Sequence, residues 1–484
     1  MKHRDLVVAL ALLPASALAA DHFFLIGGGP KPSSSQAQIE FNVNWVVASL
    51  RELAPDGVVD IFFADGTGGA RTAVELIARH DGDELPLAPL ASVYGAEFDN
   101  RLRYRAHRIP NVLASTRKDV LVPALVARLS ALRPGDQAMI VYNGHGTWES
   151  DRVENALRLW EDTELSVREF EAVLFRVDPT VPVRFILTQC YSGAFARAVH
   201  SDAEHTLELA AGQRCGFMAE SSERESEGCS ASVELGDYRD YTTYFFAGLT
   251  GEDRLGRPVP TATDRDGDGR ITPFDAHLYT LLEGYNGDLP RSTSEDFLER
   301  WQPWTGRWVG TGSLPQNLYG DLARAMAGRA GLPADGPALG RALESSYDSL
   351  ARLNVAELRT RDSLETAADR TRTAIRARIE RRWPELAHPY TAPHREVLAR
   401  DIEAIERSIR AEATYGELVQ HQARLAMLDV RLIDLDRRIS QLDKLRRTRM
   451  LARALHLLER RASPAHREAY ARLRRCEALP LRSN

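Results

Sequence analysis

Five mainly apolar runs lie in the first half of the chain, and each is bounded by glycine or polar residues. They are Phe23–Gly29, Val58–Ala64, Ala138–Tyr142, Val181–Thr188 and Cys215–Ala219. Runs of this length without alternation are typical of strands that are buried on both faces. We therefore predict five strands of a mostly parallel sheet.

Amphipathic segments separate these runs. Helical spacing of apolar residues predicts helices over Gln36–Leu53 and Asp119–Leu132, and a capping box of Ser166 and Glu169 predicts a third helix start. Strands that alternate with helices indicate an α/β fold in which helices flank both faces of the sheet.

The pattern changes near residue 320, where strand signals end and heptad-like spacing begins. Two apolar seams follow: Leu398, Ile402, Ile405 and Ile409, and then Leu425, Leu428, Leu432, Leu435, Ile439 and Leu442. Pro384, Pro389 and Pro393 mark a turn. We predict a C-terminal all-α coiled-coil domain over residues 319–484, built as an antiparallel hairpin or small bundle.

The N-terminus resembles a secretory signal peptide. A basic start, Met1–Arg4, precedes the apolar run Leu6–Leu13 and a small-residue cleavage site near Ala19. We predict a signal peptide over residues 1–19, with an uncleaved anchor as the alternative, and export to a periplasm or outside the cell. No later run reaches the length of a membrane span, so we expect no transmembrane segment.

Composition adds two constraints. The 484 residues are 44% hydrophobic and 27% charged, which excludes a disordered chain and a polytopic membrane protein. Residues 1–320 are acidic and residues 321–484 are basic, mainly through arginine. Because an exported protein is separated from nucleic acid, we expect no nucleic-acid partner. The opposite charges favour contact between the two halves of the chain.

Four cysteines are present in a chain that we expect to meet an oxidising compartment. Cys215 and Cys229 are close enough in sequence for a disulfide, which would leave Cys476 unpaired or intermolecular. Spacing alone does not decide the pairing.

Two reactive side chains follow predicted strands. His145 comes after Ala138–Tyr142, and Cys190 comes after Val181–Thr188. Adjacent parallel strands would bring their carboxyl ends together, where a histidine can deprotonate a thiol. Gly144 and Gly146 let a substrate approach the backbone, and backbone amides there can stabilise an oxyanion.

The runs IVYNGHG and, 45 residues later, FILTQCYSG resemble the His-Gly and Cys-x-Ser-Gly motifs of the caspase/legumain clan of cysteine peptidases. The resemblance spans roughly residues 21–285 and implies a caspase-like fold for a peptidase domain over residues 20–318. It also implies that Cys190 is the nucleophile, His145 the general acid and base, and Gly146 an oxyanion donor.

Ser226-Glu227-Gly228-Cys229 and Leu235-Gly236-Asp237-Tyr238 are similar to legumain segments that line the S1 pocket. The resemblance implies that Ser226 and Asp237 bind the P1 side chain. Tyr191 stands where legumains have Glu, and no Arg occurs in Gly29–Glu40. Both asparagine and a basic residue therefore remain candidates for P1.

A calcium-loop pattern lies downstream. Its ligand positions are Asp264, Asp266, Asp268, Arg270 (carbonyl), Thr272 (through water) and Asp275. Hard oxygen ligands around a tight glycine turn suit Ca²⁺, which we expect to be structural.

These features predict an exported thiol protease that cleaves a protein or peptide substrate through a thioester. Legumain-type zymogens resemble this arrangement, so we also expect residues 320–484 to dock over Cys190 and restrain it. The alternative is a silent, calcium-stabilised scaffold that acts or self-associates through its C-terminal helices.

Overall fold

The structure, a computed structural model, describes residues 19–66, 69, 71–76, 87–202, 207–302, 312–389 and 391–482. The predicted signal peptide lies outside these residues, apart from residue 19. Within the described ranges, no helix combines the length and the apolar character needed to cross a membrane.

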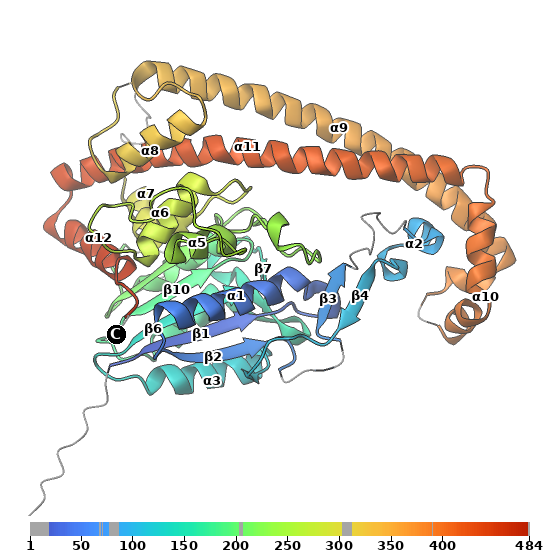
Figure 1. Ribbon diagram of the computed structural model, residues 1–484, viewed down its shortest axis with the longest axis horizontal. Coiled ribbons are helices and arrows are strands. Elements are labelled where there is room, and N and C mark those ends of the chain that lie inside the picture. Colours follow the sequence, from blue (N-terminus) through green and yellow to red (C-terminus); the bar gives the residue numbers. More distant parts are fainter. Residues whose placement is uncertain are drawn as a thin grey trace, which may run out of the picture.

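A seven-stranded sheet forms the centre of the molecule (Figure 1), and its strand order is β12-β11-β10-β6-β1-β2-β5. The strands are β1 (Asp21–Gly27), β2 (Val58–Phe63), β5 (Val112–Ala114), β6 (Gln137–Asn143), β10 (Val183–Leu187), β11 (Arg214–Met218) and β12 (Arg291–Ser292). All neighbours pair in parallel except β11 and β12. The mostly parallel sheet is therefore confirmed, and the five predicted strands are β1, β2, β6, β10 and β11.

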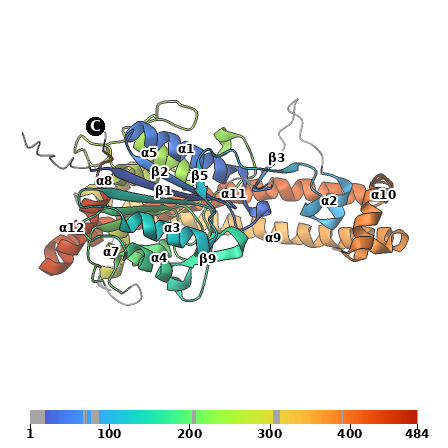
Figure 2. The ribbon, with the colours of Figure 1, turned by 90° about the horizontal axis from the view of Figure 1, so that it is seen from below.

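Helices cover both faces of this sheet, as the sequence predicted. Figure 2 shows α1 and α5 on one side and α3, α4 and α7 on the other. Their bounds are α1 (Ala37–Leu53), α3 (Lys118–Ser130), α4 (Val167–Leu174), α5 (Tyr241–Thr250), α6 (Pro273–Glu283) and α7 (Thr293–Trp301). The capping box at the start of α4 is present, since Ser166 accepts from the Glu169 amide and Glu169 from that of Ser166.

Two small antiparallel sheets extend the carboxyl edge of the main sheet. One pairs β3 (Ala73–Leu76) with β4 (Leu102–Arg105), and the other has the order β7 (His145–Thr147), β8 (Ala156–Leu159), β9 (Thr163–Ser166). A short helix, α2 (Pro89–Tyr94), lies between β3 and β4 in the chain. Their strands are short and partly exposed, so the sequence contains no long apolar run that predicts them.

The C-terminal part is helical, as predicted. It consists of α8 (Leu318–Arg329), α9 (Gly336–Arg382), α10 (Ala392–Arg410), α11 (Tyr415–Arg461) and α12 (Pro464–Glu477). The long helices α9 and α11 lie side by side and antiparallel, and they bridge the sheet domain and α2 (Figure 1). The chain turns near the three prolines and again at residues 411–414, which the sequence did not predict.

The C-terminal helices share the main hydrophobic core with the sheet. Leu445 and Leu451 of α11 and Leu473 of α12 belong to the same buried cluster as Phe185 and Phe217. A second cluster joins α2 to the far ends of α9, α10 and α11. Helix α11 is therefore anchored at both ends and passes over the carboxyl edge of the sheet between them.

Candidate functional site

The two predicted reactive residues follow neighbouring strands. β6 and β10 pair in parallel, with Tyr142 opposite Leu187, so the loops that carry His145 and Cys190 leave the same edge. The loops touch, because a Cβ atom at Gly146 would clash with the Cys190 carbonyl oxygen. Glycine at this position is therefore a requirement of the contact between them.

A tight turn follows Cys190. Tyr191 has a left-handed backbone (φ +59°), which costs about 1 kcal/mol for a residue with a side chain. Its amide donates to the Arg224 carbonyl (2.9 Å), and the Glu220 amide donates to the Ser192 hydroxyl (3.1 Å). The segment 220–224 thus holds the turn that presents the thiol, and strain of this kind is common at functional sites.

The Cys190 thiol lies beside Ser226. The Ser226 hydroxyl donates to the Thr188 carbonyl (3.0 Å), and its oxygen is 3.7 Å from Cys190 Sγ. Burial raises the pKa of the Cys190 thiol above its usual value, despite the Ser226 hydrogen bonds. Cys190 is therefore a neutral thiol at pH 7, and a base must remove its proton before it can attack.

His145 is oriented by other residues. Its Nε2 lies 2.8 Å from the Ser34 carbonyl and 3.0 Å from Gln36 Oε1. Because both partners are acceptors, Nε2 carries the proton and Nδ1 is left to accept one. Burial lowers the pKa of His145, so the imidazole is neutral at pH 7. The structure describes both His145 and Cys190 and records no hydrogen bond between them. It therefore brings their backbone segments together but not their side chains.

The two predicted substrate-binding residues line one cavity. Ser226 and Asp237 face a space of about 570 Å³ whose opposite wall comes from α11 through Leu432, Ile433, Asp436 and Arg437. Sequence analysis missed these α11 residues as parts of the site. Leu432 belongs to the heptad seam, and the seam gives no sign that neighbouring positions face the sheet domain.

Most charges around this cavity are paired. Glu227 binds Arg437, Asp436 lies 3.3 Å from Arg224, and Asp240 accepts from Asn42 (2.7 Å). Asp237, in contrast, has no ion pair within the described part of the chain. The cavity therefore offers a free carboxylate to a ligand.

The calcium-loop residues are only partly brought together. Oxygen atoms of Asp264, Asp266 and Asp268 lie within 4.8 Å of one another. Asp275 instead caps α6: one of its oxygens accepts from the amides of residues 265 and 266, and the other from Thr272. Three carboxylates thus fit a hard cation, whereas Asp275 and the Thr272 hydroxyl are engaged within the protein. Arg270 is exposed.

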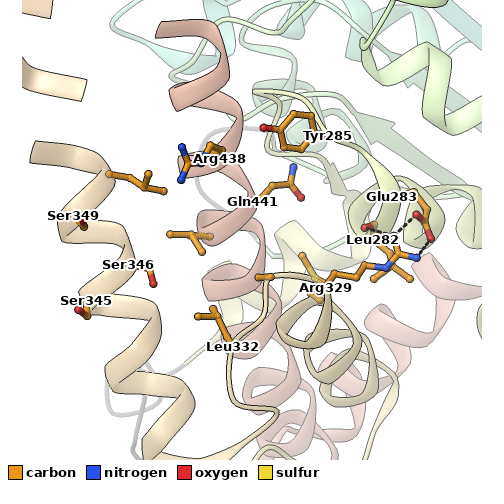
Figure 3. Close-up of a pocket in the computed structure, with 14 residues that line it drawn as sticks. Leu282, Glu283, Tyr285, Arg329, Leu332, Ser345, Ser346, Ser349, Arg438 and Gln441 are labelled. Atoms are coloured by element: carbon orange, nitrogen blue, oxygen red, sulfur yellow. Dashed lines mark hydrogen bonds and ion pairs between the residues drawn. The ribbon is translucent and has the colours of Figure 1, made fainter. Parts of the chain in front are cut away.

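A further cavity, of about 710 Å³, lies elsewhere in the described structure. Figure 3 shows it between α9 and α11, next to Tyr285 and the Arg329–Glu283 ion pair. It contains none of the predicted site residues.

The disulfide differs from the pair that spacing suggested. Cys215 of β11 is bonded to Cys476 of α12, across 261 residues, and Cys229 is free. The pairing of Cys215 with Cys229 is thus wrong, because Cys229 lies at the reactive edge with its sulfur 3.9 Å from the Gly144 carbonyl.

Comparisons with known proteins add little. No protein-family model and no curated protein matches the chain. Among solved structures, protein GSU0716 from Geobacter sulfurreducens, a structural genomics target, is similar at 15% identity with a TM-score of 0.27. The match covers 44% of this chain and 77% of that one.

Proposed function

We propose that the protein is an exported cysteine endopeptidase of the caspase/legumain type. The observation that carries this proposal is the junction of the Gly146 and Cys190 loops at the carboxyl edge of adjacent parallel strands, beside a cavity lined by Ser226. A strained turn at Tyr191 presents the thiol at that junction.

The proposed reaction begins with a neutral pair. Nδ1 of His145 takes the proton of the Cys190 thiol, and the sulfur attacks the peptide carbonyl. The amides of Gly146 and Cys190 hold the oxyanion. His145 then returns the proton to the leaving amine, and water, or a competing amine, opens the thioester. The two side chains must come together on substrate binding, since catalytic hydrogen bonds often form only in the complex with substrate.

Asp237 directs our proposal for the substrate. Since its carboxylate lacks an ion pair in the described structure, a cationic P1 side chain would find a partner there, and an asparagine amide would gain a weaker one. A scan of P1 residues in fluorogenic peptides, beside Cys190→Ala, tests both points. Cleavage that survives Cys190→Ala excludes the mechanism, and a preference for uncharged P1 residues excludes the role of Asp237.

We propose that α11 also restrains the site, since Ile433 stands in the cavity wall. Deletion of residues 320–484 would remove part of the main core, so a point substitution is the cleaner test. Ile433→Ala should raise kcat/KM for large P1 residues if the helix obstructs the cavity. An unchanged kcat/KM would show that α11 does not obstruct the cavity.

We further propose that Asp264, Asp266 and Asp268 hold a structural Ca²⁺. Three clustered carboxylates repel one another unless a cation neutralises them. Calcium should raise the melting temperature relative to chelator, and Asp264→Asn should abolish the difference. The Cys215–Cys476 disulfide supports export, because such bonds persist in oxidising compartments.

A scaffold that acts through its helices is the second candidate. It is favoured by the exposure of Met427 (68%) and Val430 (69%) on α11, where a second copy could dock. A phenotype that survives Cys190→Ala, together with a dimer in solution that Val430→Asp disrupts, would support this function over peptidase activity.

A further inference from the structure

We propose that α11 is a permanent part of the substrate site, in which Arg437 and Lys444 are positioning residues for the segment that carries Ser226. This inference rests on the proposed peptidase function for its meaning. The residues concerned are 220–228, which hold the turn after Cys190 and line the cavity that Ser226 and Asp237 share.

Arg437 fixes the residue next to Ser226. Its Nε lies 3.1 Å from both carboxylate oxygens of Glu227, and its Nη2 makes a closer contact with Oε1. Glu227 is also held by the facing loop, since its Oε2 accepts from the Gly287 amide (2.9 Å) and its own amide donates to Asp288 (2.6 Å). Among the described residues, Arg437 of α11 supplies the one ion pair to the Glu227 carboxylate, so loss of Arg437 frees Glu227 on that side.

A second contact runs from α11 to the nucleophile turn. The Arg224 guanidinium lies 3.3 Å from both Asp436 and Ser440 of α11. The carbonyl of Arg224 accepts from the Tyr191 amide, next to Cys190. Two residues therefore separate α11 from the reactive thiol along this path.

Lys444 supports the loop behind the segment. Its ammonium is buried and donates to the Gly284 carbonyl (2.7 Å) and to Asn286 Oδ1 (2.7 Å). The Asn286 amide in turn donates to Asp288 (2.9 Å), which accepts from Glu227. Lys444 thus fixes the segment 284–288, whose Gly287 and Asp288 bind Glu227.

Helix α11 is attached to the sheet domain by several buried contacts, so it does not act as a cover that detaches from the site. The disulfide from Cys215 to Cys476 ties the following helix to β11. Arg447 is buried against Glu295 (2.8 Å) and Glu299 (2.6 Å), and buried Glu477 accepts from the Ser294 amide (2.7 Å). A helix held in this way remains in place during turnover and can define the site.

The test compares Arg437→Gln with Arg438→Gln in the full-length mature protein. Arg438 is a matched control, because it is adjacent, exposed, and without a hydrogen bond or ion pair to any described residue. We expect Arg437→Gln to lower kcat/KM by about 10- to 100-fold, as misplaced site residues do, with the control near wild type. Arg437→Lys should restore part of the loss.

Hydrogen exchange gives a readout that does not depend on peptidase activity. We expect the amides of Glu227 and Gly287 to exchange faster in Arg437→Gln and in Lys444→Met, at an unchanged rate in Arg438→Gln. Equal exchange in Arg437→Gln and its control overturns the inference, whether or not the wild type cleaves peptides. An inactive wild type with the expected exchange pattern overturns the proposed function alone.

Discussion

Removal of the Cys215–Cys476 disulfide tests how strongly the C-terminal helices are tied to the sheet. The bond closes a loop of 261 residues, and both sulfurs are buried. In the chain-entropy description, a loop of this length restricts the unfolded chain enough to contribute about 5.5 kcal/mol to the free energy of unfolding. With an unfolding entropy of about 2.1 cal/mol/K per residue, 484 residues give about 1 kcal/mol/K. We therefore expect Cys215→Ala/Cys476→Ala to lower the melting temperature by about 5 °C.

Circular dichroism of the wild type and the double variant measures this shift, with Cys229→Ala as the control that removes a thiol and leaves the bridge. Thiol titration under denaturing conditions gives the pairing directly. Two free thiols, Cys190 and Cys229, are expected before reduction and four after it. Four free thiols without reductant, or a double variant that melts with the control, would refute the covalent attachment of α12 to β11.

Three further predictions concern the site and its support. The rate of Cys190 alkylation by iodoacetamide should rise steadily from pH 7 to 9, because burial holds the pKa of this thiol above its usual 9.0; a plateau below pH 7 would instead indicate a thiolate–imidazolium pair. Gly146→Ala should lower kcat/KM by about 100-fold in a folded protein, since the added methyl displaces the Cys190 carbonyl; activity near wild type would contradict the packing of the two loops. Burial alone would raise the pKa of Glu295, but His277 and Arg447 outweigh it and hold that pKa far below 4.5. The unfolded chain therefore takes up the proton first, and stability from Glu295 is present above pH 4.5 and lost below it. Urea unfolding at pH 3 and pH 7 should show a smaller difference for Glu295→Gln than for wild type, and an equal difference would refute the assignment.

The sheet could be read from the sequence because its central strands are buried on both faces. The run Val58–Ala64, for example, corresponds to β2 (Val58–Phe63) within one residue. The edge elements could not be read in this way. Strand β12 has two residues, and β7 is half-buried, so neither leaves a periodic signal. The carboxyl edge from which the His145 and Cys190 segments leave was predicted, because it depends only on the central strands.

The C-terminal helices were predicted as helices, but their partners were not. The seam from Leu425 to Leu442 suggested packing against the neighbouring arm, and much of α11 does contact α9. Its other face binds the sheet domain through Arg437, Ser440 and Lys444, which are polar and follow no apolar period. Polar contacts of this kind depend on which residues of the sheet domain lie opposite the helix, so no pattern along the helix alone predicts them.

The position of α11 bears on how such a site evolves its specificity. One wall of the cavity at Ser226 comes from the sheet domain and the other from a helix more than 200 residues later in the chain. Substitutions at Leu432 or Ile433 can alter the shape of the cavity without touching the segments that carry Cys190 and Gly146. The same helix also fixes the Ser226 segment through Arg437. Substitutions on α11 can therefore change both the cavity wall and the position of the Ser226 segment. On the proposed peptidase function, a variant selected for a new P1 residue should therefore carry substitutions on α11 as well as in the segment 220–228, and sequencing of such variants would show whether the two sets arise together.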